Sequence, residues 1–564
     1  MRFHHQIICI GAALASVFAG AFFTPSARAN VYATDIKLNG GLSGITNGSG
    51  TNVAISYILN EPATRGVTVN ILSGSTVVRS IPIASGAVGA RKGTNLVTWD
   101  GFGSGGATLG GGAYTVNITA SATGFTNWTQ TSTDTNDGYH VFSPRGIAVN
   151  TNPNSVYYGR VFVGNATEND SAALPGDLAG ILKANADGSP ADEGQGNTNG
   201  FQAGIQWGTD GFNGNPHFLR YGQDDRIYAL DWDDRGVVYA MDMMVSTNQV
   251  VLDANNYSAN PVTGLSLGWG EFDVTDAGTP NGRIFLGDND SPGLGLWFWQ
   301  LTNGVADPND TMGKQVIAVG GDLDLFANGG SMMDERSNIF VGQNIETSGS
   351  SSPRVLEFTN WDGMSTFTNG SAWQSGANDD SFLGGFDLAL DSRANPKYVA
   401  VALSISGGLR VLNATNGFII TNGTQVLDNL DSTNLYYGVA WDGAGNLYGA
   451  INNSAASDNK WRVFSPPGTN QTTTVAVETV FVPGAVISSI TLTSIILNST
   501  TVTINFTDPS DASPTSFSLQ SSAMANSGYT TVGSAVITRT SAGHFQATVT
   551  SSATAQFYRI KRGS

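Results

Sequence analysis

The sequence contains a single cysteine, Cys9, among its 564 residues. Cys9 lies in an N-terminal apolar stretch that we expect to be removed on export, which would leave the mature chain without a thiol. This absence excludes disulfide bonds and cysteine metal ligands. The folded chain must therefore be stabilised by its hydrophobic cores, because no covalent cross-link is present to assist them.

Charged residues are also scarce, and most of them are acidic. They make up 12% of the chain, against about a quarter in an average protein. Lys and Arg total 26 and Asp and Glu total 44, so the formal net charge is −18. Such a surface repels nucleic acid and anionic membrane, and we expect neither as a partner. Ser, Thr, Asn and Gly replace the missing charges and favour strands and tight turns.

Long amphipathic and long apolar segments are missing as well. We find no extended 3.6-residue apolar period, which argues against long helices. The apolar run 7–23 is too short and too rich in Gly and Ala for a membrane span of about 20 residues. It follows the basic Arg2 and precedes Ala27-Arg28-Ala29, as in a secretory signal. We expect cleavage after Ala29, a secreted, periplasmic or cell-surface location and no membrane insertion; the alternative is an uncleaved N-terminal anchor.

Alternating apolar residues and glycine-rich turns indicate a small β-sandwich over residues 30–135. Val53 and Ile55 alternate in one segment, and 67–71 does the same in another. Thr98-Trp99-Asp100-Gly101, the glycines 110–112 and the following Ala113-Tyr114-Thr115-Val116 resemble the FlgD Ig-like domain of exported bacterial proteins. That resemblance implies a spacer or assembly role without catalysis, with Trp99 in the core.

Residues 140–484 contain a degenerate repeat. Segments 228–242 (YALDWDDRGVVYAMD) and 437–451 (YGVAWDGAGNLYGAI) align without a gap as strand, Trp-Asp turn and strand. Weaker copies begin at 146, 272, 330 and 386, and a third strand follows most of them. The second strands carry a central bulky residue, namely Phe162, Tyr239, Phe285, Phe340, Val399 and Tyr448. The turns carry Asn150, Asp233, Asp276, Asp334, Asp391 and Asp442, which we expect to bond their own backbone.

Six such copies predict a six-bladed β-propeller, because sheets that cannot bury both faces alone can stack in a closed ring. Gly146-Ile147-Ala148-Val149-Asn150 and Leu447-Tyr448-Gly449-Ala450 resemble the repeats of NHL-like six-bladed propellers. A seventh blade is the alternative, and residues 475–482 or the wide gap between the first two copies would supply it. We interpret the Gly/Asn-rich stretch 186–214 in that gap as an inserted loop.

The last region, 485–564, predicts a second β-sandwich. Val502, Ile504 and Phe506 alternate, and the chain ends in AQFYRIKRGS. The segment resembles the fibronectin- or Ig-like modules that close many exported bacterial proteins. It would serve as a docking or a solubilising module, and no LPxTG-type motif or apolar tail indicates an anchor. The predicted fold class is thus all-β, a propeller flanked by two small β-sandwiches.

The alignment of the six repeat copies also predicts candidate binding residues. In such propellers the loops after the second strands converge near the axis, and the polar residues there are Asn165, Asp242, Asp288 and Gln343. Ala402 and Ile451 occupy the other two positions. Oxygen-bearing side chains suit Ca²⁺, so Asp242, Asp288 and Asp290 are candidate metal ligands. The alternative is that these side chains cap strand ends and bond to their own loops.

The sequence shows no convincing catalytic constellation. His140, His217 and His544 lie far apart, and no G-x-S-x-G turn is present. We predict a secreted binding or scaffold protein whose propeller recognises an extracellular glycan, peptide or protein, with the sandwiches as spacers or docking units. The alternative is a calcium-dependent, lactonase-like propeller hydrolase or a polysaccharide-acting enzyme. Trp297-Phe298-Trp299 would serve as inter-blade packing or as a sugar platform.

Overall fold

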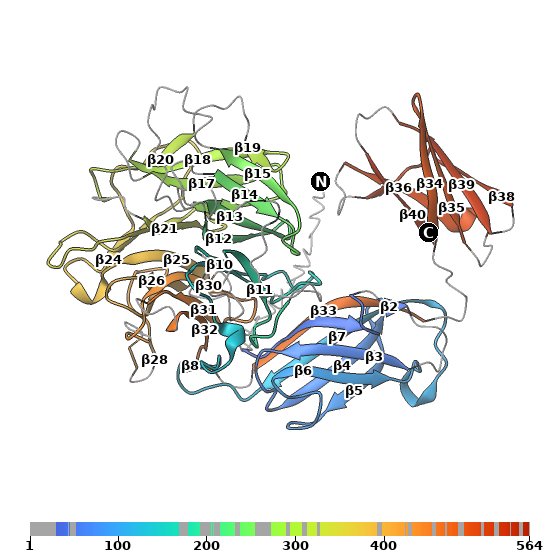
Figure 1. Ribbon diagram of the computed structural model, residues 1–564, viewed down its shortest axis with the longest axis horizontal. Helices are drawn as coiled ribbons and strands as arrows, with labels where there is room; N and C mark the ends of the chain where they lie inside the picture. Colours follow the sequence, from blue (N-terminus) through green and yellow to red (C-terminus); the bar gives the residue numbers. More distant parts are fainter. Residues whose placement is uncertain are drawn as a thin grey trace, which may run out of the picture.

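The computed structural model describes residues 30–42, 44–45, 52–167, 179–191, 203, 205, 207, 215–231, 237–253, 272–288, 294–306, 313–323, 328–391, 398–422, 425–426, 431–453, 458–468, 471–482, 490–508, 513–523, 529–541, 543–551 and 556–562. All regular elements in these residues are β-strands and short 3₁₀ helices. The chain is therefore all-β, with a propeller and two sandwiches (Figure 1). No helix in these ranges has the length and hydropathy needed to cross a bilayer.

Six first strands surround the propeller axis. They are β9 (Pro144–Val149), β12 (Pro216–Gly222), β16 (Phe272–Thr275), β21 (Asn328–Met333), β25 (Gly385–Asp391) and β30 (Tyr436–Trp441). Each contacts the next, and β30 contacts β9. The ring formed by the described strands thus closes with six blades, as the repeat predicts.

The outer strands of each blade follow in chain order. The first three blades add β10 (Val161–Asn165) and β11 (Gly180–Ala184); β13 (Arg226–Asp231), β14 (Val237–Met241) and β15 (Asn248–Asp253); then β17 (Arg283–Asp288), β18 (Gly295–Thr302), β19 (Val305–Ala306) and β20 (Lys314–Ala318). The last three add β22 (Ile339–Gln343), β23 (Val355–Phe358) and β24 (Trp373–Ser375); β26 (Tyr398–Leu403) and β27 (Leu409–Asn413); then β31 (Leu447–Ile451) and β32 (Lys460–Ser465). A separate hairpin joins β28 (Thr421–Asn422) to β29 (Gln425–Val426).

The last blade is completed by residues that precede the first blade. β8 (Thr129–Gln130) pairs with β32, Gln130 opposite Phe464 and Thr129 opposite Ser465. Trp128, beside β8, packs against Trp441 of the same blade with ring centroids 6.1 Å apart. This pairing joins the two ends of the propeller segment and leaves fewer exposed sheet edges.

Glycines near the start of the first strands explain why the repeat begins with Gly. A Cβ at Gly146 would lie 2.5 Å from Leu219 N, and one at Gly438 would lie 2.3 Å from Arg145 O. A Cβ at Gly330 would lie 2.5 Å from Leu388 N. Neighbouring first strands therefore touch backbone to backbone at this level, which only glycine permits.

The N-terminal sandwich has two sheets. One is β1 (Ala33–Leu38), β3 (Val53–Leu59) and β6 (Gly93–Trp99); the other is β2 (Gly44–Ile45), β33 (Gln471–Val482), β7 (Gly112–Ala122), β4 (Gly66–Ser73) and β5 (Thr76–Ile83). Alternate residues of β3 and β7 are buried, as their sequence pattern predicts. Trp99 is fully buried and its Nε1 donates to Phe102 O at 2.8 Å, so it is a core residue.

The position of β33 corrects the boundary expected from the sequence. The range 140–484 assigned β33 to the propeller, and 475–482 was a candidate seventh blade. Instead β33 pairs antiparallel with β7, from Gln471 opposite Ala122 to Val482 opposite Gly112, and it appears beside β7 in Figure 1. The propeller is inserted between two adjacent strands of the sandwich, because an alternating strand can complete either sheet and only tertiary pairing selects one.

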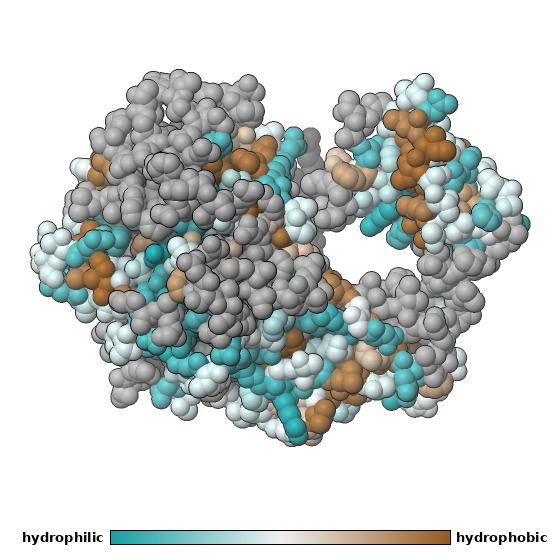
Figure 2. Space-filling view, in the orientation of Figure 1, coloured by the Kyte–Doolittle hydropathy of each residue, from teal (hydrophilic) through white to brown (hydrophobic). Residues whose placement is uncertain are grey.

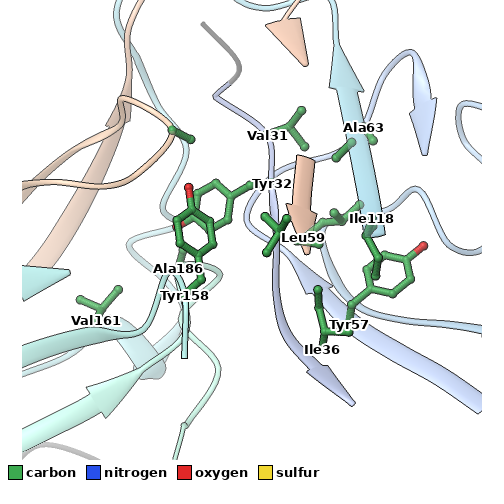
Figure 3. Packing of buried hydrophobic residues seen from close by; sticks show 14 of the residues in the cluster. Val31, Tyr32, Ile36, Tyr57, Leu59, Ala63, Ile118, Tyr158, Val161 and Ala186 are labelled. Atoms are coloured by element: carbon green, nitrogen blue, oxygen red, sulfur yellow. The ribbon is translucent and has the colours of Figure 1, made fainter. Parts of the chain in front are cut away.

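The sandwich and the propeller share one hydrophobic core. Tyr32, at the start of β1, packs edge to face on Tyr158 of the first blade with centroids 5.3 Å apart. Figure 3 shows these two rings side by side between Leu59 of the sandwich and Val161 of the propeller. The chain passes from the sandwich to the propeller and back again. These two connections and the shared core hold the sandwich against the propeller.

The C-terminal sandwich is built from β34 (Thr491–Asn498), β35 (Thr501–Thr507), β39 (His544–Thr550) and β38 (Val536–Ser541) facing β37 (Thr530–Thr531), β36 (Phe517–Ser522) and β40 (Phe557–Arg562). Phe506, Phe517 and Phe545 pack against one another in its core. The edge strand β34 is exposed throughout, and its apolar side chains form a stripe in Figure 2.

Candidate functional site

An axial cavity of about 510 Å³ lies between the six first strands of the propeller. Its walls come from the later part of each strand, with Val149, Tyr221, Thr275, Met333, Leu390 and Trp441 among them. The turn residues that follow these strands, Asp276, Asp334, Asp391 and Asp442, also line it. The cavity therefore opens toward the face formed by the turns that connect the first and second strands of each blade. The binding residues were predicted on the opposite face.

An aromatic cluster fills the axis where the first strands begin. Phe218 of the second blade stacks on Phe386 of the fifth at 5.6 Å, and His217 lies 5.3 Å from Phe386. Tyr437 packs on Phe386 at 4.7 Å and lies 4.4 Å from the Arg145 guanidinium. Because these side chains meet across the ring, they form the floor of the cavity.

His217 belongs to this floor. Burial lowers its pKa well below the usual value, and the charge of Arg145 lowers it further. The imidazole is therefore neutral at physiological pH. It packs between aromatic rings, and its position gives it a structural role in the floor.

An ion pair crosses the axis just above the aromatic floor. Arg220 Nη2 lies 2.7 Å from Asp387 Oδ1, and both side chains are almost fully buried. Asp387 Oδ2 accepts the backbone N–H of Val439 at 3.0 Å. This network ties together the second, fifth and sixth blades.

A second carboxylate, Asp273, lies beside this pair and lines the cavity. It is buried, and its Oδ2 accepts the backbone N–H of Met333 at 2.9 Å. Burial raises the pKa of Asp273 to about 6, although the charge of Arg220 opposes the rise. The floor thus holds an ion-paired carboxylate, Asp387, and a carboxyl group that exchanges its proton near neutral pH.

The cavity wall is acidic overall. Six carboxylates line it, Asp273, Asp276, Asp334, Glu335, Asp391 and Asp442, against two cations, Arg220 and Arg283. Arg220 is engaged by Asp387. The Arg283 guanidinium lies 5.4 Å from the Trp361 ring centroid and forms no ion pair within the described ranges. A ligand carrying negative charge would therefore be repelled.

Two of the turn carboxylates bond their own backbone, as the sequence predicts. Asp442 Oδ1 accepts the backbone N–H groups of Ala444, Gly445 and Asn446 at 2.7–2.8 Å. Asp334 Oδ1 accepts those of Arg336 and Asn338. These bonds stabilise the turns that shape the cavity mouth. Asp233 lies outside the described residues.

Three of the predicted binding residues are buried at the ends of second strands. Asn165 Oδ1 accepts the backbone N–H of Ser143 at 2.7 Å, and Gln343 Nε2 donates to Pro353 O at 2.7 Å. Asp288 is likewise fully buried at the end of β17. None of the three lines the axial cavity. Ligand binding by these residues stays a prediction, and the bonds of Asn165 and Gln343 are those of a strand cap.

Asp242 does not end a second strand. The sequence alignment of the repeat was shifted by one strand in the second blade, so that the second and third strands were taken for the first and second. Segment 228–242 spans β13 and β14, the second and third strands, so Tyr239 is on a third strand. The residue equivalent to Asn165 is Asp231, whose Oδ1 accepts Asn215 N–H at 2.8 Å. Successive hairpins of a blade have similar sequences, so the pattern alone does not fix the frame.

Asp242 is held within its own turn. Its Oδ2 accepts the hydroxyls of Ser246 and Thr247 at 2.6 and 2.7 Å, and its Oδ1 accepts the backbone N–H of Met244 at 3.0 Å. Partial burial would raise its pKa, but these hydrogen bonds outweigh that effect and lower it. The carboxylate stays ionised and serves the turn.

The calcium ligands predicted from sequence do not converge. Asp288 ends a second strand and Asp242 follows a third strand, so they lie on opposite faces of the propeller. Asp290 lies outside the described residues. Within the part of the chain that is described, no group of three or more His, Cys, Asp or Glu side chains is arranged to hold a metal ion.

The axial residues Arg220, Asp273 and Asp387 were missed by the sequence analysis. A signal was present, because Phe272-Asp273 and Phe386-Asp387 repeat a Phe-Asp pair at the start of two first strands. A carboxylate inside an otherwise apolar strand needs a partner. Arg220 supplies that partner to Asp387 from the opposite blade, which no local pattern indicates.

Comparison with known proteins gives only distant similarity. No family model and no curated protein matches the chain. A GH74 xyloglucanase from Xanthomonas campestris is 12% identical with a TM-score of 0.28, over 57% of this chain and 37% of that one. A putative 6-phosphogluconolactonase from Bacteroides fragilis is 10% identical with a TM-score of 0.29, over 72% and 97%. The chain thus spans little more than a third of the xyloglucanase, and these likenesses do not bear on function.

Proposed function

We propose that this chain is an exported binding protein whose propeller receives a polar group of an extracellular glycan or protein. The axial cavity supports the proposal, since about 510 Å³ is within the usual range of ligand pockets. The aromatic floor closes one end of the axis, so a ligand enters from the face of the first turns. The two sandwiches then act as spacer or docking units.

The charge of the wall supports one class of ligand. Carboxylates accept hydrogen bonds and attract cations, and they outnumber the cations that line the cavity. The ligand therefore presents donors without negative charge: the hydroxyl groups of a neutral glycan or a basic side chain of a protein. These two sources are separable, because binding of a basic group weakens with salt and binding of neutral hydroxyls does not.

Titration calorimetry with neutral oligosaccharides and with Lys- or Arg-containing peptides tests this function. Glu335→Gln alters a carboxylate at the mouth, and we expect it to weaken binding several-fold. Glu346→Gln is the matched control, because Glu346 is exposed beyond the end of β22, away from the cavity. Equal effects of the two substitutions, or binding of acidic ligands alone, would refute a cavity site.

A second candidate function is hydrolysis of a glycosidic or lactone bond in the same cavity. Asp273 favours it, since a carboxyl group with a pKa of about 6 can both donate and accept a proton near neutral pH. The test is turnover of neutral polysaccharides and lactones by the whole chain and by Asp273→Asn. Turnover that disappears in Asp273→Asn while binding persists would support catalysis by Asp273. If the unsubstituted chain shows no turnover, binding is the function that is left.

A further inference from the structure

Asn30, the residue that follows the expected cleavage point, is completely buried. Its backbone carbonyl accepts hydrogen bonds from Asn60 Nδ2 at 2.6 Å and Asn446 Nδ2 at 2.9 Å. Its own Nδ2 donates to Pro466 O at 2.7 Å. Asn60 belongs to the sandwich, whereas Asn446 and Pro466 belong to the last propeller blade. The first residue of the expected mature chain is thus held where the two domains meet.

A buried carboxylate, Glu61, lies in the same place. Glu61 is 2% exposed, its Oε2 lies 3.5 Å from Ser465 Oγ, and its Oε1 has no hydrogen-bond partner within the described residues. Ser465 Oγ in turn donates to Asn446 Oδ1 at 2.7 Å, and Asn446 bonds the carbonyl of Asn30. Asn60, which bonds the carbonyl of Asn30 directly, is the residue before Glu61, so Glu61 is next in the chain to a contact of Asn30.

The other charged groups around Glu61 do not satisfy it. Asp442 adds negative charge, although its own carboxylate is satisfied by three backbone N–H groups and by Asn446 Nδ2. Lys92 attracts Glu61, but its Nζ bonds Thr131 O at 2.6 Å and Tyr139 Oη at 3.5 Å. Tyr32 and Tyr448 lie beside Asp442, and burial raises the pKa of both phenols, so they stay neutral. Among the described residues, no cation therefore lies within hydrogen-bond distance of the Glu61 carboxyl group.

We propose that cleavage after Ala29 supplies this cation, and that the α-ammonium group of Asn30 pairs with Glu61 to fasten the sandwich to the last propeller blade. Hydrolysis breaks the Ala29–Asn30 peptide bond. Water gives its hydroxyl to the carbonyl carbon of Ala29 and a proton to the nitrogen of Asn30. That amine takes a further proton from solvent, since its unperturbed pKa is about 7.7–8.0. Export thus creates a positive charge where a buried carboxylate lacks one, and maturation stabilises the domain interface.

The ion pair predicts opposite pH behaviour for the two forms. In a chain that extends beyond Asn30, burial raises the pKa of Glu61 to about 7, so stability falls as the pH rises through 7. In the chain that begins at Asn30, pairing lowers the pKa of Glu61 and raises that of the α-amine. The mature chain therefore keeps its stability at neutral pH, and loses it in acid as Glu61 is protonated and in alkali as the amine is neutralised.

Thermal melting at pH 7 of two chains tests the proposal. One chain begins at Asn30, released from a fusion by a protease that leaves no extra residue, and the other is released in the same way but begins at Ala29. The extra residue moves the α-ammonium group away from Glu61 and leaves an uncharged peptide N–H at Asn30. We expect the Asn30 chain to melt at a measurably higher temperature than the Ala29 chain. Equal melting temperatures would overturn the proposal, and this comparison needs no substitution.

Glu61→Gln adds a second test, because it should change the melting temperatures of the two chains in opposite directions. It removes a buried unpaired charge from the Ala29 chain and should raise its melting temperature, whereas it leaves an unpaired ammonium in the Asn30 chain and should lower it. Glu346→Gln, at an exposed site, should alter neither. Labelling of the α-amine, followed by mass spectrometry, should be more than tenfold slower in the folded Asn30 chain than in the unfolded chain. Equal labelling rates, or an exported chain whose intact mass shows another first residue, would contradict the proposal.

Discussion

Replacing Asp273 by Asn should stabilise the propeller in a strongly pH-dependent way. Asp273 is buried on the axis, and burial raises its pKa from 3.8 to about 6. A raised pKa means that the folded state favours the protonated carboxyl group. Its contribution is therefore favourable below pH 4 and is lost as the pH rises through 6. Asn is a neutral isostere that can still accept the backbone N–H of Met333 through its amide oxygen.

The magnitude follows from the shift in pKa. Each unit corresponds to about 1.4 kcal/mol, so ionising Asp273 in the folded chain costs up to about 3 kcal/mol at pH 8. We expect Asp273→Asn to raise the free energy of unfolding by about 1–3 kcal/mol at pH 8 and to leave it nearly unchanged at pH 4. The shift to about 6 already includes the opposing charge of Arg220, so no further allowance for that residue is made.

Urea unfolding followed by tryptophan fluorescence at pH 4, 6 and 8 measures this effect. Asp276→Asn is the control, because Asp276 is a half-buried acid that lines the mouth of the same cavity. A loss of stability in Asp273→Asn that is equal at all three pH values would refute the reasoning. It would mean that the carboxylate is stabilised as an anion by Arg220, and that the axis holds two ionised acids.

Further predictions concern the axis and the close contacts of the first strands. Arg220→Met should destabilise the propeller by about 3–5 kcal/mol, because it leaves Asp387 buried without its cation, whereas the double variant Arg220→Met, Asp387→Leu should recover most of that loss in the same urea assay. Gly438→Ala should cost about 1–3 kcal/mol, since its Cβ would meet Arg145 O at 2.3 Å, while Gly110→Ala, with no atom within 4 Å of its Cβ, should be near neutral. Deleting β33 should expose the edge of β7 and lower the melting temperature of the whole sandwich–propeller unit, and an unchanged melting curve would argue against the shared sheet.

Local sequence patterns were sufficient to predict most strands of this protein and their broad grouping into domains. Alternation at Val53 and Ile55, or at Val502, Ile504 and Phe506, encodes strands locally, because each side chain follows its own position on the pleat. The recurrent Gly and Asp of the copies encode close strand contacts and tight turns, as at Gly438 and Asp442. Six copies predicted six blades, and the seventh blade that the sequence left open at 475–482 is instead a strand of the sandwich.

Tertiary structure alone decided which strand pairs with which and what meets at the axis. The frame of segment 228–242, the pairing of β33 with β7 and that of β8 with β32 depend on partners far away in sequence. Arg220 meets Asp387 only because ring closure places the second and fifth blades opposite each other. The alternation of apolar residues and the chemistry of turns are local properties of the sequence. Strand pairing and the meeting of side chains at the axis depend on the closed ring, and the candidate site is formed by side chains that meet there.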